Sequence, residues 1–162
     1  MLRFFNSGSL SKLRDHIKVS PAGFRYGFLE NVFREDGYAE LLNTYPPFSL
    51  FHFHEDAYKK VFEGPYYDSH DHAGCDHHLR VLPAVWQELL REAASDEFIQ
   101  MFREASGVEF NSLRNFSFKY GKKGCEIRPH LDQASRSKGP GASRLVSMWY
   151  FSSRPGGGPG GT

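Results

Sequence analysis

The chain has 162 residues, of which 40% are hydrophobic and 15% aromatic, and its formal net charge at pH 7 is +1. This length suits a single domain with a substantial core, and a charge so close to zero gives no electrostatic reason to expect nucleic acid or an anionic membrane as a partner. No apolar run reaches membrane-spanning length and the N-terminus lacks the apolar centre of a secretory signal, so we expect a cytoplasmic protein.

The composition also favours a β-rich interior in a reducing compartment. Fifteen phenylalanines and eight tyrosines are typical of strands. Cys75 and Cys125, the two cysteines, are too few for a disulfide framework.

The N-terminal third is expected to contain short helices and one strand. Apolar side chains at helical spacing in residues 9–17, with Ser9 as the capping residue, predict a surface helix that ends before Pro21. Residues 24–29 alternate aromatic and other side chains, which indicates a strand. A turn and a short helix follow in residues 31–45, and Pro46 and Pro47 stop the helix.

Residues 48–67 predict irregular chain with a strand near residues 60–62. Residues 68–78, DSHDHAGCDHH, then combine histidines, aspartates and Cys75, all of which are metal-ligand types. A zinc site is one interpretation of this cluster. Because it contains neither Cys-x-x-Cys nor a helical His-x-x-x-His, we prefer to interpret it as a polar loop.

The clearest helical pattern lies in residues 82–106. Two apolar stripes at helical spacing predict two helices packed on the outside of a sheet. Ser95 is expected to cap the second helix and Gly107 to end it. The stripes consist of Trp86, Leu89, Leu90 and Ala93 in the first helix, and of Phe98, Met101 and Phe102 in the second.

The chemically most informative stretch is residues 124–132, GCEIRPHLD. Alternate side chains of a strand share a face, so His130 and Asp132 are expected to project together, away from Leu131. One imidazole and one carboxylate are two of the three protein ligands in the 2-His-1-carboxylate triad that binds Fe(II).

The order of the surrounding segments sharpens this interpretation. Residues 113–120 alternate as a strand and lead into a Gly-Lys-Lys-Gly turn. After the His-x-Asp strand come a polar loop and residues 144–151, RLVSMWYF, an apolar run that suits a buried strand. Strongly in its last third and loosely elsewhere, the sequence resembles the Fe(II)- and 2-oxoglutarate-dependent oxygenases of the prolyl 4-hydroxylase-like branch.

The resemblance implies an α+β fold with a double-stranded β-helix, or jelly-roll, core and N-terminal buttressing helices. Residues 1–108 would be the helical and strand support region and residues 109–162 the first strands of the core, within one domain spanning residues 1–162. The distal histidine of the triad and the basic residue that pairs with 2-oxoglutarate have no counterpart before Thr162. We therefore expect this chain to be an incomplete form, inactive by itself, in which the unpaired strand at 144–151 promotes self-association.

The implied function is a dioxygenase that hydroxylates a C–H bond. It would use Fe(II), with 2-oxoglutarate as co-substrate and ascorbate as a supporting reductant. His130 and Asp132 would bind the metal and Tyr120 would orient the co-substrate. Prolyl residues of a peptide, a free amino acid or another small molecule all fit as substrate, and the oligomeric state stays open. The other two function classes are a catalytically silent jelly-roll binding domain and a zinc-binding protein that uses residues 68–78.

Overall fold

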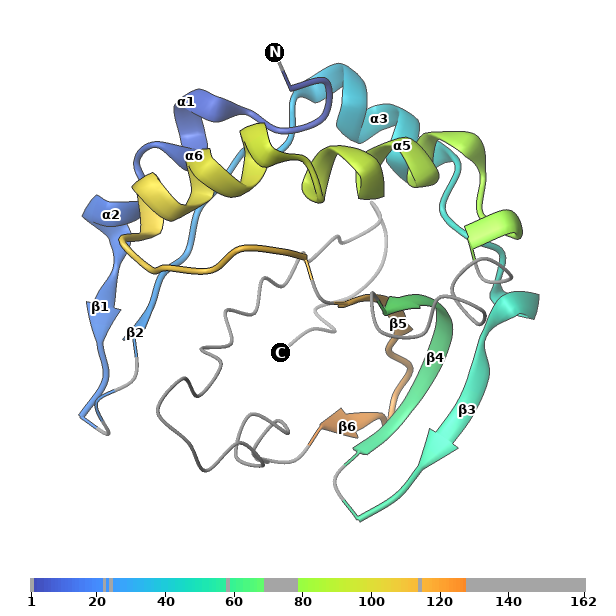
Figure 1. The fold of residues 1–162 in the computed structure, drawn as a ribbon. Helices are drawn as coiled ribbons and strands as arrows, with labels where there is room; N and C mark the ends of the chain where they lie inside the picture. The colour runs from blue at the N-terminus through green and yellow to red at the C-terminus, as the bar shows by residue number, and fades with distance from the viewer. Residues whose placement is uncertain are drawn as a thin grey trace.

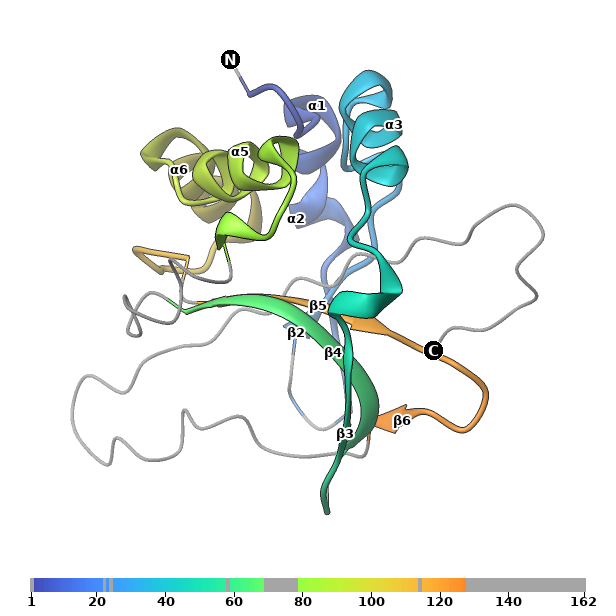
Figure 2. The ribbon, with the colours of Figure 1, turned by 90° about the vertical axis from the view of Figure 1, so that its right-hand side faces the viewer.

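The computed structural model describes six stretches of the chain: residues 2–21, 23, 25–57, 59–68, 79–113 and 115–127. Their architecture is α+β, as the sequence predicts. The helices gather on one side of the molecule and a curved, four-stranded antiparallel sheet lies on the other (Figures 1 and 2).

Two short helices open the fold, α1 (Ser7–Leu10) and α2 (Leu13–His16). The side-chain oxygen of Asn6 caps α1 by accepting hydrogen bonds from the backbone N–H groups of Gly8 and Ser9, at 3.1 and 3.2 Å. The prediction of one helix capped by Ser9 is therefore wrong in detail. Asparagine is as good an N-cap as serine, and it stands at an earlier position from which its oxygen reaches the first turn.

A small ribbon follows, formed by β1 (Lys18–Val19) and β2 (Arg25–Tyr26) in antiparallel pairing. All four residues are exposed. The predicted strand at 24–29 is thus confirmed for two residues only. With no face of this ribbon covered, the alternating pattern has no packing to extend it.

Helix α3 (Glu35–Asn43) confirms the helix predicted within residues 31–45. It buries Leu41, whose exposed fraction is 2%, whereas Tyr38 stays near the surface. Gly37 brings α3 close to the N-terminal segment, since a Cβ atom at this position would lie 3.1 Å from the ring of Phe4.

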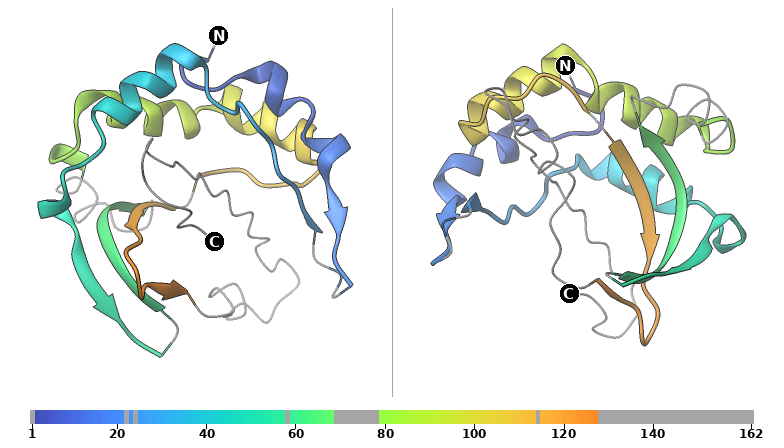
Figure 3. Two further views of the ribbon diagram at one scale, coloured as in Figure 1. Left: turned by 180° about the vertical axis from the view of Figure 1, so that it is seen from behind. Right: turned by 60° about the horizontal axis from the view of Figure 1, so that its bottom comes forward.

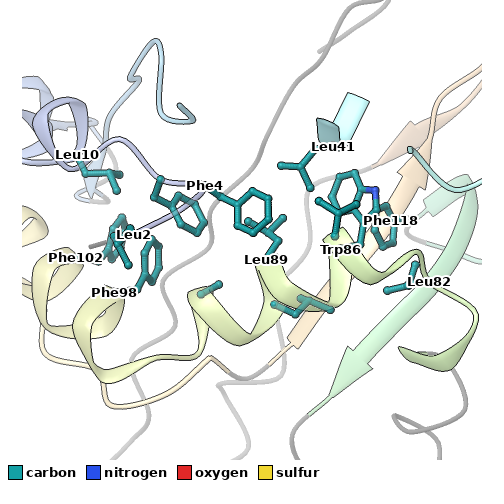
Figure 4. Packing of buried hydrophobic residues seen from close by; sticks show 14 of the residues in the cluster. Leu2, Phe4, Leu10, Leu41, Leu82, Trp86, Leu89, Phe98, Phe102 and Phe118 are labelled. Carbon is teal, nitrogen blue, oxygen red and sulfur yellow. The ribbon is translucent and has the colours of Figure 1, made fainter. Parts of the chain in front are cut away.

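Helices α5 (Ala84–Ala93) and α6 (Asp96–Ser106) confirm the strongest helical prediction. The hydroxyl of Ser95 accepts a hydrogen bond from the N–H of Phe98 at 3.2 Å, and Gly107 ends α6 in the left-handed region at φ +65°. Figure 4 shows Phe98 and Phe102 of α6 beside Leu2, and Leu89 of α5 beside Phe4.

The main sheet begins after a 3-10 helix (Phe48–Leu50). Its strands run antiparallel in the order β3-β4-β5, and β6 also pairs with β4. Figure 3 shows how this sheet curves away from the helices. The strands are β3 (His52–Glu55), β4 (Lys59–Asp68), β5 (Asn115–Tyr120) and β6 (Glu126–Ile127).

A bulge in β4 sets the curvature near the helices. Glu63 pairs with Lys119 and Tyr66 with Ser117, so two residues of β4 oppose Phe118 alone. One of the two is Gly64, where a Cβ atom would lie only 2.8 Å from the ring of Phe51.

Aromatic side chains join the helix layer to the sheet. The ring of Trp86 on α5 lies 4.7 Å from that of Phe118 on β5, and Tyr45 packs edge-on against both at 5.8 and 5.6 Å. The indole N–H of Trp86 donates a hydrogen bond to the backbone carbonyl of Thr44 at 3.0 Å, which satisfies its polar atom inside this cluster. One face of the sheet is therefore covered by helices.

Candidate functional site

The predicted metal ligands, His130 and Asp132, lie outside the described residues, as does Arg128. The structure describes the strand that leads toward them, because β6 ends at Ile127. The structure therefore gives the course of the chain up to Ile127, and the assignment of His130 and Asp132 as ligands stays a prediction.

Strands β5 and β6 are two parts of one interrupted strand along the same edge of β4. Tyr120 of β5 pairs with Phe62, and Glu126 of β6 pairs with Lys60. The predicted turn at residues 121–124 therefore leaves the sheet edge and returns to it without reversing the chain. Phe62 and Lys60 are two positions apart on β4, so their partners Tyr120 and Glu126 lie on the same face of the sheet.

Tyr120, the predicted 2-oxoglutarate contact, lies on the face that also carries Phe118. Its ring is 5.1 Å from that of Phe48 and 6.0 Å from that of Phe51, and 40% of the residue is exposed. Tyr120 thus stands at the rim of the aromatic core, beyond the helices, with part of its surface in solvent.

The opposite face of the sheet carries a charged cluster that the sequence did not reveal. Glu63 lies at its centre, with the ammonium groups of Lys59 and Lys119 at 2.8 and 3.6 Å from its Oε1 atom. The imidazole Nδ1 of His54 is 3.8 Å from Oε2, and its Nε2 is 2.9 Å from the carboxylate of Asp56. Three strands contribute to the cluster, so only the pairing of β3, β4 and β5 assembles it.

The electrostatics of this cluster favour an ionised Glu63. Partial burial raises the pKa of its carboxyl group, but the hydrogen bond from Lys59 and the charges of Lys59, Lys119 and His54 outweigh burial and hold the pKa below its ordinary value. The signal available in the sequence was the alternation in residues 52–55 and 115–120, but the partners across strands depend on register.

The described residues contain no group of three or more His, Cys, Asp or Glu side chains placed to hold a metal ion. Of the cluster at 68–78, the structure describes only the backbone of Asp68, at the end of β4. Cys125 is a half-buried free thiol, whereas Cys75 lies outside the described residues. The zinc interpretation and the polar-loop interpretation therefore both stay predictions.

Among the described helices, none combines the length and the apolar character needed to cross a membrane. Comparisons of the chain with protein-family models, with curated proteins and with solved structures found no match.

Proposed function

We propose that this protein is an Fe(II)- and 2-oxoglutarate-dependent dioxygenase that hydroxylates a C–H bond. The observation that carries the proposal is the His130-Leu131-Asp132 tripeptide, which follows two segments that lie along one edge of a curved antiparallel sheet. In this proposal the jelly-roll core continues from these strands, and the imidazole of His130 and the carboxylate of Asp132 bind the metal.

The register supports a shared location for Tyr120 and the metal ligands. Glu126 lies on the same face as Tyr120 because their partners on β4 are two positions apart. If the strand continues past Ile127 as the sequence pattern predicts, alternation brings His130 and Asp132 to this face as well. The β6 end of the sheet lies away from the helices (Figure 1).

The chemistry of the residues fits the proposed cofactor. Bound Fe(II) would supply oxygen activation, which couples the oxidative decarboxylation of 2-oxoglutarate to succinate and CO2 with insertion of one oxygen atom into the substrate C–H bond. The side chains bind and orient: His130 offers a neutral nitrogen, Asp132 offers a negative oxygen, and the hydroxyl of Tyr120 donates a hydrogen bond to a carboxylate of 2-oxoglutarate.

Metal content separates this proposal from its alternatives. The purified chain, its His130→Ala and Asp132→Ala variants and a His72→Ala control are titrated with Fe(II) or Zn²⁺ without oxygen, and bound metal is measured at equilibrium so that a weak site is detected. We expect the first two variants to bind Fe(II) more weakly than the parent and His72→Ala to bind it equally. Weaker metal binding only in His72→Ala would instead indicate a zinc protein that uses residues 68–78, and identical binding by all four would indicate a silent domain.

Turnover provides the second test. Succinate formed from 2-oxoglutarate with Fe(II) and ascorbate is measured for the 162-residue chain and for His130→Ala. The sequence predicts no difference, since two ligands should hold Fe(II) too weakly. Succinate clearly above the His130→Ala level would mean that the third ligand lies within these residues, and the histidines at 70–78 would be tested first.

The role of Tyr120 has its own test in any form of the protein that turns over. Tyr120→Phe removes one hydrogen bond to the co-substrate, worth about 0.5–1.5 kcal/mol, so KM for 2-oxoglutarate should rise roughly two- to twelvefold while kcat changes little. An unchanged KM would assign Tyr120 to packing against Phe48 and Phe51 alone.

A further inference from the structure

Four aromatic rings form a partly exposed surface beside the aromatic core, where Phe48 stacks on Phe51. We call it the aromatic patch; it consists of Phe48, Phe53, Phe62 and Tyr120. The ring of Phe48 lies 5.0 Å from that of Phe62 and 5.1 Å from that of Tyr120, while Phe53 is 5.2 Å from Phe62. Phe48 is 41% exposed and Phe53 50% exposed, so the patch is in part open to solvent.

A cation of the chain itself lies over this patch. The ammonium group of Lys122 is 3.9 Å from the ring centroid of Phe48 and 5.1 Å from that of Phe62, both within the range of cation–π attraction. Lys122 belongs to the loop that leaves the edge of β4 between β5 and β6. That loop is pinned by hydrogen bonds in which the N–H of Cys125 donates to the carbonyl of Lys122 at 2.9 Å and the N–H of Lys122 donates to Sγ of Cys125 at 3.3 Å.

We propose that the aromatic patch is a binding site for a trimethylated lysine side chain of a partner protein, and that Lys122 occupies the site in its absence. The ring faces supply a negative quadrupole, and Lys122 demonstrates that a lysine-length side chain with a terminal cation fits over Phe48 and Phe62. Phe48, Phe53 and Tyr120 are exposed, which suits a side chain presented by another protein. The site needs no iron, and it shares Tyr120 with the proposed contact to 2-oxoglutarate.

The trimethylated form follows from competition with Lys122. An intramolecular lysine has a high effective concentration, so a free cation must interact better with the rings to displace it. Methylation weakens the hydration of the ammonium group and adds apolar contact with the ring faces, and aromatic surfaces favour such quaternary cations. The contact with Lys122 thus limits binding to partners with this modification.

The test is an NMR titration of the full chain with three blocked amino acids: N-acetyl-trimethyllysine methylamide, the unmethylated lysine analogue, and the norleucine analogue, which has the same stem without charge. We expect the trimethyllysine probe to bind most tightly and the norleucine probe least. In Lys122→Ala, binding of the trimethyllysine probe should tighten by about two- to fivefold, the equivalent of one exposed cation–π contact.

Two further variants keep the test decisive. Lys123→Ala removes the next lysine of the loop, which has no ring contact among those the structure describes, and should leave binding unchanged. Phe48→Leu retains an apolar side chain but removes the ring, and should weaken the trimethyllysine probe at least fivefold while circular dichroism stays that of the parent. Three results would each overturn the proposal. The first is that the norleucine probe binds as tightly as the trimethyllysine probe, and the second is that Lys122→Ala and Lys123→Ala change binding equally. The third is that Lys122→Ala does not bind the trimethyllysine probe at millimolar concentration.

Discussion

Replacing Glu92 by alanine should destabilise this protein far more than a typical surface substitution, because its carboxylate holds the N-terminal segment on α5. The backbone N–H groups of Phe4 and Phe5 donate to its Oε1 atom at 2.8 and 3.0 Å, and that of Arg3 donates to Oε2 at 2.6 Å. These donors lie in an irregular segment that has no strand or helix of its own to satisfy them.

The magnitude follows from the surroundings of each donor. Water can reach the exposed N–H of Arg3, so its loss should cost little, whereas the N–H groups of Phe4 and Phe5 are partly buried. An unsatisfied buried donor costs about 1–3 kcal/mol. Because these two donors are only partly buried, Glu92→Ala should lower the free energy of unfolding by about 2–4 kcal/mol, the lower part of the range for two donors. Glu92→Gln keeps one carbonyl oxygen for the two partly buried donors, so its free energy of unfolding should fall about half as much as that of Glu92→Ala.

Glu88→Ala is the matched control for Glu92→Ala. Glu88 lies one turn earlier on α5 and forms an exposed ion pair with the guanidinium of Arg3. Exposed pairs contribute about 0–1 kcal/mol, so this variant should stay close to the parent. Urea unfolding followed by circular dichroism gives the free energy of unfolding of both variants. Its dependence on urea concentration should be the same as in the parent. Equal losses for Glu92→Ala and Glu88→Ala would refute the reasoning, since charge alone would then account for the effect.

Two further predictions concern the sheet. Gly64→Ala places a Cβ atom 2.8 Å from the buried ring of Phe51 and should lower the free energy of unfolding by about 1–3 kcal/mol in the same urea experiment; an unaffected midpoint would mean that the ring shifts freely. The pKa of Glu63 is lower in the folded state, so its contribution to stability is present above the unfolded pKa, near 4.5, and is lost as the pH falls through the folded pKa. Glu63→Gln should therefore lose less stability than the parent as the pH falls from the unfolded pKa through the folded pKa, and parallel curves for the two proteins would contradict the assignment.

Local signals in the sequence were sufficient for the long helices. The apolar stripes of α5 and α6, the Ser95 cap and the left-handed Gly107 each depend on residues within a few positions of one another, and the structure has all of them. The same reasoning failed by a few residues at α1, where Asn6 and Ser9 were both competent caps. A choice between two local signals of equal strength is made by packing, which here buries Leu10.

The candidate site likewise combines features that local sequence predicts with features that depend on tertiary structure. Alternation in a strand predicts that His130 and Asp132 share a face, and their assignment as metal ligands stays a prediction. That Tyr120 and Glu126 share a face could not be predicted, because the loop between them interrupts the alternation. Only their separate pairing with Phe62 and Lys60 of β4 restores the register.

By itself, then, the sequence determined the helices, the existence of β4 and β5, and the residue types that could bind a metal, because these depend on local spacing. Tertiary structure decided which charges meet around Glu63, which cation lies over Phe48, and which carboxylate holds the N-terminal segment. Each of these contacts joins residues far apart in the chain, and its partner is selected by strand register and helix packing. Spacing along the chain carries no information about such partners.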